Sequence, residues 1–370
     1  MNEYHYKYGN TPYSTQSYNQ GNGFEERPRV PIIKVNKPIV TYVLIAINII
    51  MWGLLSFISS KTGESYNELL MLFGAKINIK IIQGQYWRFI TPIFLHADIT
   101  HLLVNCYSLH AVGTTVERIY GHTKFLVIYL IAGTLGSILS FVFSINPAVG
   151  ASGAIFGLLG ALLYFGVEHP RLFRAFFGRS IFMILAINLG YGYVNKRIDN
   201  FGHIGGLIGG FLASGIVKAP FNGKWYLSKA TYIILILAIL ASGLAYGFNY
   251  GNNNALLMLE ELYKHDQNQN WNEAVKIGQD ILDLKPTNKN INIEVLWITA
   301  KAEVITGKYN EAVEHAKTLV KLSPVNGHYL LGIIYYDLGQ LNLAKEELLK
   351  AKALSSPYPN IDELLRKIGD

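Results

Sequence analysis

The sequence has little charge and almost no cysteine. Only 15% of its 370 residues are charged, whereas 51% are hydrophobic, and the mean hydropathy is +0.24. Such a composition is too apolar for an ordinary soluble protein. The single cysteine, Cys106, excludes an intrachain disulfide, so an oxidising compartment is neither required nor excluded. The net charge of +7 is modest, and the basic residues cluster between apolar runs, which is typical of membrane topology and does not indicate nucleic-acid binding.

The first 37 residues are polar and precede the first long apolar run. They contain no short apolar core with a small-residue cleavage site, so we expect no cleavable signal peptide. Residues 1–26 are rich in Tyr, Asn, Gln, Ser and Gly, which predicts a disordered tail. Five tyrosines among the first 20 residues leave a binding segment as the alternative.

Long apolar runs between Pro38 and Asn249 predict a polytopic membrane protein. A bilayer needs about 20 apolar residues per helical span. Seven runs approach this length, although the second is only partly apolar and the fourth and fifth are short. The predicted spans are residues 38–58, 91–113, 123–144, 151–168, 179–194, 201–219 and 226–248.

Lysine and arginine predict how these spans are oriented. They gather in the N-terminal tail and in every second loop, so the tail is expected on the cytoplasmic side. An odd number of spans then places residues 251–370 outside the cell. On the opposite side, the long loop 59–90 is mildly basic, and the loop at 195–200 carries only the basic pair Lys196-Arg197. The residues that set the orientation are Lys7, Arg27, Arg29, Lys34, Lys37, Arg118, Lys124, Arg171, Arg174, Arg179, Lys218, Lys224 and Lys229.

Two polar residues stand at matching depths in this topology. Spans four and six run in the same direction, and they begin at Ser152 and near His203. A histidine inside a membrane is costly and therefore indicates a functional site. Serine becomes a strong nucleophile when a base takes its proton, and histidine is the commonest such base. No acidic residue lies at this depth in spans four or six, so the sequence predicts a Ser–His dyad instead of a triad.

The second span adds His96, His101 and Asn105. His101 and Asn105 are four residues apart and share one helix face, from which both could donate hydrogen bonds to an oxyanion beside Ser152. Two alternatives remain open. These side chains could simply bond neighbouring helices, or His96, His101 and His203 could hold a metal, although no carboxylate or cysteine accompanies them at ligand spacing.

Small residues recur at every fourth position of spans four and six, namely Gly153, Gly157 and Ala161, and Gly202, Gly206 and Gly210. This spacing lets helix backbones approach closely. Taken alone, it indicates helix packing and no chemistry.

In combination these motifs resemble the rhomboid family of intramembrane serine proteases over roughly residues 38–220. The resemblance implies an all-α fold, with a six-helix core and one appended C-terminal span. The matching motifs, in order, are Trp87-Arg88, the set His96, His101 and Asn105, Glu117-Arg118, Gly150-Ala151-Ser152-Gly153, and His203 followed by Gly206.

The resemblance also implies roles for individual residues. Ser152 is the expected nucleophile, His203 the base, and His101 and Asn105 the oxyanion stabilisers together with backbone N–H groups. A departure occurs at Phe156, which stands where a tyrosine often stacks on the catalytic histidine, so the ring is kept and the hydroxyl is lost. Residues expected to support the fold near the site are Trp87, Arg88, Phe156, Gly150, Gly153 and Gly206.

Residues 251–370 read as a separate soluble domain of paired amphipathic helices. Ala274, Ala312 and Ala344 occupy equivalent positions, with turns at Asn270, at Gly307-Lys308 and at Gly339-Gln340, and with second helices ending near Pro286, Pro324 and Pro357. The irregular spacing around 34 residues resembles about three tetratricopeptide repeats, which usually bind a protein partner. A generic helical bundle is the alternative.

The sequence thus predicts three regions: a tail (1–37), a membrane protease domain (38–250) and a repeat domain (251–370). The expected activity is serine endopeptidase cleavage of other membrane proteins in or near a transmembrane helix, in the lipid bilayer, with no cofactor, no metal and no nucleic acid. A catalytically silent scaffold of the same fold is the first alternative. A transporter is the second, although the spans lack a broken inverted repeat or paired intramembrane charges.

Overall fold

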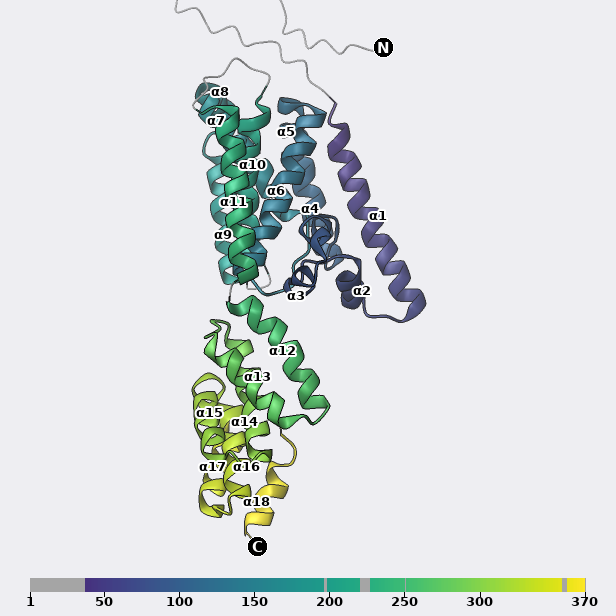
Figure 1. Cartoon of the computed structure of the whole chain (residues 1–370). Coiled ribbons are helices and arrows are strands. Elements are labelled where there is room, and N and C mark those ends of the chain that lie inside the picture. The colour runs from purple at the N-terminus through teal and green to yellow at the C-terminus, as the bar shows by residue number, and fades with distance from the viewer. Residues whose placement is uncertain (1–36, 196–197, 220–226, 250, 355–357, 370) are drawn as a thin grey trace, which may run out of the picture. The chain divides into compact units, whose positions relative to one another are not determined.

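The computed structural model describes residues 37–195, 198–219, 227–249, 251–354 and 358–369. Residues 1–36 of the predicted tail, and with them Lys196, Arg197, Lys224 and Pro357, lie outside the described residues. Within these ranges the chain is helical, and its only β-type pairing is an isolated antiparallel bridge between Lys76 and Ala148 (Figure 1).

The apolar part of the chain forms eleven of the described α-helices and three short turns of other helix types. The turns are η1 (Tyr86–Phe89), η2 (Thr91–Phe94) and the π-helical η3 (Leu109–Gly113). The α-helices are α1 (Ile39–Thr62), α2 (Tyr66–Phe73), α3 (Asn78–Ile82), α4 (Ile99–Ser108), α5 (Thr114–Tyr120), α6 (His122–Phe143), α7 (Ser152–Glu168), α8 (Pro170–Phe176), α9 (Ser180–Val194), α10 (Asn200–Val217) and α11 (Lys229–Asn249).

Four described helices are long and apolar enough to cross a membrane: α1, α6, α10 and α11. A fifth is obtained if α8 and α9, which are bent by 71°, form one span. Each of the seven predicted runs contains a helix, but α7 has only 17 residues and α4 only 10. The chain is therefore a polytopic membrane protein, while the count of seven spans remains a prediction.

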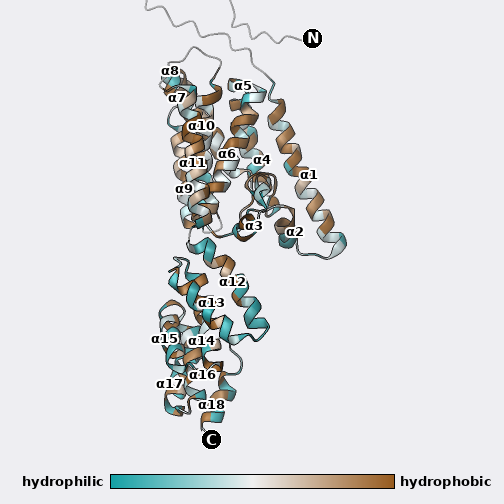
Figure 2. Ribbon diagram, viewed as in Figure 1, coloured by the Kyte–Doolittle hydropathy of each residue, from teal (hydrophilic) through white to brown (hydrophobic). Residues whose placement is uncertain are grey.

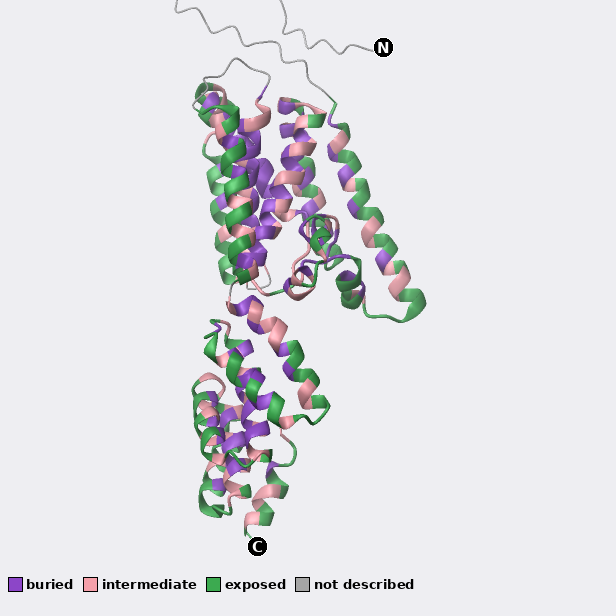
Figure 3. Cartoon of the chain, viewed as in Figure 1, coloured by how far each residue is buried: buried purple, intermediate pink, exposed green. Residues whose placement is uncertain are grey.

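Burial separates the central helices from the peripheral ones. In the apolar window of α6, 67% of the residues are buried, against 22% in α1 and 17% in α11. The exposed side chains of α1 and α11 are largely hydrophobic, as Figures 2 and 3 show together. Apolar side chains that face outwards are compatible with lipid contact. The core of the bundle is formed by α6, α7 and α10, which pack closely on one another.

The second predicted span starts later than the sequence suggested. Its α-helix begins at Ile99, because Asp98 caps it by accepting a hydrogen bond from the backbone N–H of His101 at 2.8 Å. Residues 91–94 instead form the turn η2, with Pro92 in its first turn. The N-terminal boundary of the partly apolar span predicted over 91–113 was therefore wrong.

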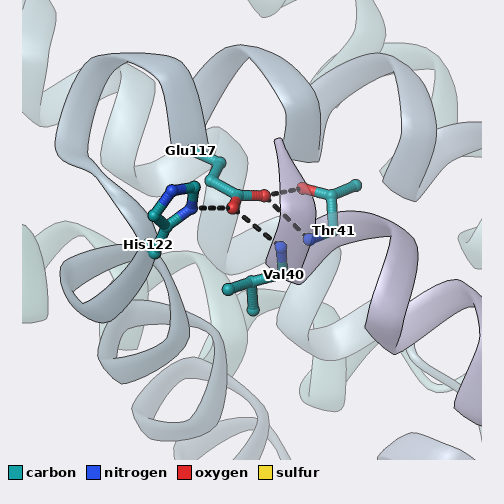
Figure 4. Close-up of polar contacts among 4 residues, drawn as sticks. All are labelled: Val40, Thr41, Glu117 and His122. Atoms are coloured by element: carbon teal, nitrogen blue, oxygen red, sulfur yellow. Dashed lines mark hydrogen bonds and ion pairs between the residues drawn. The ribbon is translucent and has the colours of Figure 1, made fainter. Parts of the chain in front are cut away.

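A buried glutamate of α5 holds the start of α1 against that helix. The Glu117 carboxylate accepts hydrogen bonds from the backbone N–H groups of Val40 and Thr41, at 2.8 and 2.7 Å, and from the Thr41 hydroxyl at 2.6 Å (Figure 4). His122 Nδ1 lies 2.5 Å from the same carboxylate. The first N–H groups of a helix have no partner within it, so Glu117 acts as an N-terminal cap supplied from another helix.

The remaining described helices lie in the predicted repeat region. Ala274, Ala312 and Ala344 are fully buried, and each sits in the second helix of a helix pair. The three alanines thus share one environment, while the assignment to tetratricopeptide repeats remains a prediction. The helices are α12 (Gly251–Gln267), α13 (Trp271–Asp283), α14 (Lys289–Ile305), α15 (Tyr309–Leu322), α16 (Pro324–Asp337), α17 (Leu341–Ala353) and α18 (Ile361–Gly369).

Candidate active site

Ser152 and His203 lie within hydrogen-bond distance. Ser152 is the first residue of α7, and His203 lies in the first turn of α10; the distance from Ser152 Oγ to His203 Nε2 is 2.9 Å. His203 is 8% exposed. Its other ring nitrogen, Nδ1, has no hydrogen-bond partner within the described part of the chain. The two residues singled out by the sequence therefore form a pair that no carboxylate orients through Nδ1.

Glycines bring the two helices together at this depth. A side-chain carbon added to Gly206 would overlap the backbone of Gly153, and one added to Gly210 would overlap the backbone of Gly157. The four-residue spacing of small residues had indicated a close approach of these two helices, without specifying which residues meet. The close approach of α7 and α10 is what allows a short serine side chain to reach the histidine.

The Phe156 ring stacks on the imidazole of His203. The ring centroids are 4.1 Å apart and the planes are 9° from parallel. Phe156 is one turn after Ser152 on α7, so it packs on the face of the base while the serine contacts its edge. The ring expected from the family resemblance is thus in place, and its missing hydroxyl is not needed for this contact.

The expected oxyanion residues surround Gly150, two residues before Ser152. Gly150 has φ +126°, and a Cβ there would collide with the His101 ring and approach Asn105 Nδ2. The Ala97 N–H points to His101 Nδ1 at 3.4 Å, which assigns the ring proton of a neutral His101 to Nε2. Asn105 Nδ2 donates to the His101 carbonyl at 3.0 Å. His101 and Asn105 therefore present donors beside the N-terminus of α7.

His96 is fully buried, and its ring meets that of His101 edge-on at 5.3 Å. Neither of its ring nitrogens has a hydrogen-bond partner within the described ranges. The described residues contain no group of three His, Cys, Asp or Glu side chains placed to hold a metal ion. His96, His101 and His203 are thus not assembled as a ligand set.

A cavity opens at Ser152 and His203. Its walls come from the loop between α2 and α3, from η2 and α6, from the segment before α7, and from the first residues of α7 and α10. The lining residues are Lys76, Pro92, Ile93, Gly133, Gly136, Ser137, Ser140, Ala148, Val149, Gly150, Ser152, Gly153, Asp199, Gly202 and His203.

Two charged residues of this lining were not predicted. Asp199 caps α10 by accepting from the Gly202 N–H at 3.0 Å, and a helix-capping residue four positions before His203 was a signal that the sequence offered. Lys76 gave no such signal, because a single lysine in a mixed loop is usually exposed. Here it is fully buried; burial lowers the pKa of Lys76 to about 8, while the nearby Asp199 carboxylate acts in the opposite direction.

The loop region between α1 and α4 is supported by Arg88. Its Nη1 donates to the carbonyl oxygens of Met71 and Ala75, both at 2.8 Å, and its Nε donates to Gln85 at 2.7 Å. Trp87 is 55% exposed. Of the two neighbours expected to support the fold here, Arg88 makes the polar contacts.

Comparison of the chain with known proteins identifies its family. The model of the Rhomboid domain matches residues 83–220, which include every residue of the pair and of the oxyanion region. The chain is 34% identical over 181 residues to the putative rhomboid protease YdcA of Bacillus subtilis, covering 87% of that protein and 48% of this chain. The chain belongs to the rhomboid family.

Two other rhomboid relatives match the chain, and the match to the first is longer than the membrane domain. The rhomboid protease GluP of Bacillus subtilis is 39% identical over 318 residues, which is 85% of this chain and 61% of that protein. Rhomboid-like protease 1 of Toxoplasma gondii is 35% identical over 186 residues, or 47% of this chain and 63% of that protein. The chain thus spans less than two thirds of the length of GluP.

Proposed function

We propose that this rhomboid protein is an intramembrane serine endopeptidase that cleaves other membrane proteins in or near a transmembrane helix. The observation that carries the proposal is the 2.9 Å contact between Ser152 Oγ and His203 Nε2 at the wall of a cavity within an apolar helical bundle. The relatives named as rhomboid proteases support the same reaction class. The alternative of a catalytically silent scaffold has no feature in its favour here, since nucleophile and base lie in reach of one another.

The proposed chemistry follows from the positions of these groups. His203 Nε2 takes the proton of Ser152 as Oγ attacks the scissile carbonyl carbon. The resulting oxyanion is stabilised by His101, by Asn105 and by the free N–H groups of the first turn of α7. His203 then protonates the leaving amine, an acyl-enzyme remains on Ser152, and water activated by His203 releases it.

The cavity explains why such a reaction can occur in a bilayer. Hydrolysis consumes water, and polar side chains at the wall, including Ser137, Ser140 and Asp199, give water partners there. A transmembrane helix hides its carbonyls in hydrogen bonds, so the substrate must unwind before Ser152 can attack. We therefore propose substrates whose helices open readily near the outer face.

We further propose that the N-terminus lies in the cytoplasm and residues 251–370 outside the cell, as the distribution of lysine and arginine predicts. The C-terminal helix pairs are proposed to be tetratricopeptide-like repeats that bind a protein partner.

The test is cleavage of a panel of single-span membrane proteins by the purified full-length chain in detergent, beside Ser152→Ala. We expect cleavage within or next to the span by the unaltered protein and none by the variant. Cleavage that persists in Ser152→Ala would exclude the serine mechanism. Specific client binding with no cleavage of any substrate would favour the silent scaffold.

A further inference from the structure

The segment that joins α6 to α7 leads directly to the proposed nucleophile. Residues 144–151 connect Phe143 to Ser152, and Ala148, Val149 and Gly150 line the cavity. Gly150 also donates its N–H to the Pro92 carbonyl at 2.9 Å. The placement of this segment therefore decides where Ser152 and the start of α7 stand relative to His101 and His203.

Lys76 holds this segment by both its side chain and its backbone. Its Nζ donates to the carbonyl oxygens of Ser144 and Asn146, both at 2.8 Å. The backbone bridge adds the bonds from Lys76 N to Ala148 O at 2.9 Å and from Ala148 N to Lys76 O at 3.0 Å. The third proton of the ammonium is accepted by Asn78 Oδ1 at 3.0 Å. All three donors of a fully buried lysine are thus used on fixed acceptors.

Asn78 extends these contacts to the C-terminal end of α6. Its Nδ2 lies 3.0 Å from the Phe141 carbonyl oxygen and 3.1 Å from that of Ser144. The last carbonyl groups of a helix lack partners within it, and a positive charge close to them is favourable. Lys76 and Asn78 together satisfy this helix end and fix the direction in which the chain leaves it.

The contacts continue into α12, the first helix of the repeat region. Asn253 is fully buried, and its Oδ1 accepts from Asn78 Nδ2 at 2.7 Å. Its own Nδ2 donates to the Gly247 carbonyl in α11 at 2.7 Å and to the Phe141 carbonyl at 3.3 Å. A buried amide that bonds three separate elements is costly to displace. The beginning of the repeat region is in this way bonded to Asn78 and to the end of α6, from which residues 144–151 lead to Ser152.

We propose that Lys76, Asn78 and Asn253 are positioning residues for Ser152, so that the junction between α11 and α12 sets the reactivity of the nucleophile. The inference rests on the proposed function, in which Ser152 attacks the substrate. None of the three touches the reacting atoms. They act through residues 144–148, and disturbing the junction displaces the serine and the oxyanion region together.

The test compares full-length variants in detergent, using the rate at which a fluorophosphonate labels Ser152. This rate reports the placement of nucleophile and oxyanion donors without substrate docking. The variants are Asn253→Ala, Lys76→Gln and the double variant. Asn249→Ala is the matched control, because Asn249 is exposed and its amide bonds the Ala245 carbonyl of its own helix.

We expect Asn253→Ala to slow labelling roughly 3–30-fold and Lys76→Gln roughly 10–100-fold, since small displacements of reacting groups cost that much. Turnover of a model substrate should fall in parallel while its KM changes by less than about twofold, because binding contacts are untouched. The double variant should be no slower than Lys76→Gln by more than about twofold, since both act through one network. Asn249→Ala should label as the unaltered chain does.

Results other than these would contradict either the positioning role or the proposed function. Folded variants that label at the unaltered rate, or single effects that multiply in the double variant, would overturn the positioning role. If Asn253→Ala does not fold, Asn253→Ser, which keeps a hydroxyl acceptor for Asn78, takes its place under the same criteria. An unaltered protein that neither labels nor cleaves would instead refute the proposed function.

Discussion

Gly206 on α10 faces the backbone of Gly153 on α7 so closely that a methyl group at Gly206 would overlap the Gly153 carbonyl oxygen. Backbone atoms cannot rotate out of the way as a flexible side chain can. Any side chain at Gly206 must therefore move one helix relative to the other, and these are the helices that carry Ser152 and His203.

Gly206→Ala should accordingly abolish most of the activity. Overpacking of this kind costs about 1–3 kcal/mol of stability, and a shift of about 1 Å between nucleophile and base costs on the order of 100-fold in turnover. Cleavage and thermal unfolding in detergent measure both effects. Gly53→Ala is the control, because a Cβ at Gly53 in α1 would meet nothing within 4 Å. Equal activities of the two variants would contradict the close packing of α7 and α10 at Gly206 as a requirement for catalysis.

Ser152→Ala and His203→Ala should each abolish cleavage while the protein stays folded. Nucleophile and base act as a unit, so the double variant should be hardly slower than either single one. Initial rates with a fluorogenic model substrate measure this, with thermal unfolding as the check on folding. Rates that fall multiplicatively in the double variant would show that the two residues act separately.

Asn105→Ala should lower turnover by about 10–1000-fold, as loss of a single oxyanion donor does elsewhere. Residual activity is expected because His101 and the N–H groups at the start of α7 remain. The matched variant is Asn188→Ala in α9, whose exposed amide bonds only its own helix at Ile184. Turnover at saturating substrate should fall in Asn105→Ala and stay unchanged in Asn188→Ala. An unchanged rate in Asn105→Ala would mean that Asn105 has a purely structural role.

Site residues could be predicted from the sequence where a polar side chain stands in an apolar run. Ser152 and His203 stand out because polar side chains are costly in apolar runs, and the glycine spacing indicated how their helices could meet. The α4 helix starts several residues later than predicted, because Asp98 caps it within a stretch of mixed polarity.

Lys76 and Asn253 could not be found in this way. Their partners lie 68 and 112 positions away, at Ser144 and Phe141, and neither local composition nor periodicity reports such contacts. The family resemblance implied a seventh span that is merely appended to a six-helix core. In the structure Asn253 of α12 bonds both Gly247 near the end of α11 and Asn78, which in turn contacts Ser144 in the segment before Ser152.

Glu117 should make stability depend on pH at the acidic end. Burial alone would raise the pKa of Glu117, but hydrogen bonds from Thr41, His122 and Val40 outweigh it and hold the pKa below its ordinary value. A carboxyl group with a lowered pKa contributes stability that is complete above its ordinary value and is lost as the pH falls through the lowered one.

Glu117→Gln should therefore unfold at a lower temperature than the unaltered protein at pH 7, and the difference should shrink as the medium is made acidic. Thermal unfolding between about pH 3 and pH 7 measures it. Glu68→Gln, at an exposed position of α2, should follow the unaltered curve. A constant difference across this range would show that the charge of Glu117 is not what secures α1.

The last prediction concerns topology. If the N-terminus is cytoplasmic and the chain crosses the membrane seven times, a protease added to intact cells should digest residues 251–370 and spare the N-terminal tail. Epitope tags at the two ends, with permeabilised cells as the control, report both results in one experiment. We expect this orientation because lysine and arginine are in excess in the tail and in alternate loops. Protection of both tags in intact cells would mean an even number of crossings, and one of the short helices α4 and α7 would then not cross the membrane.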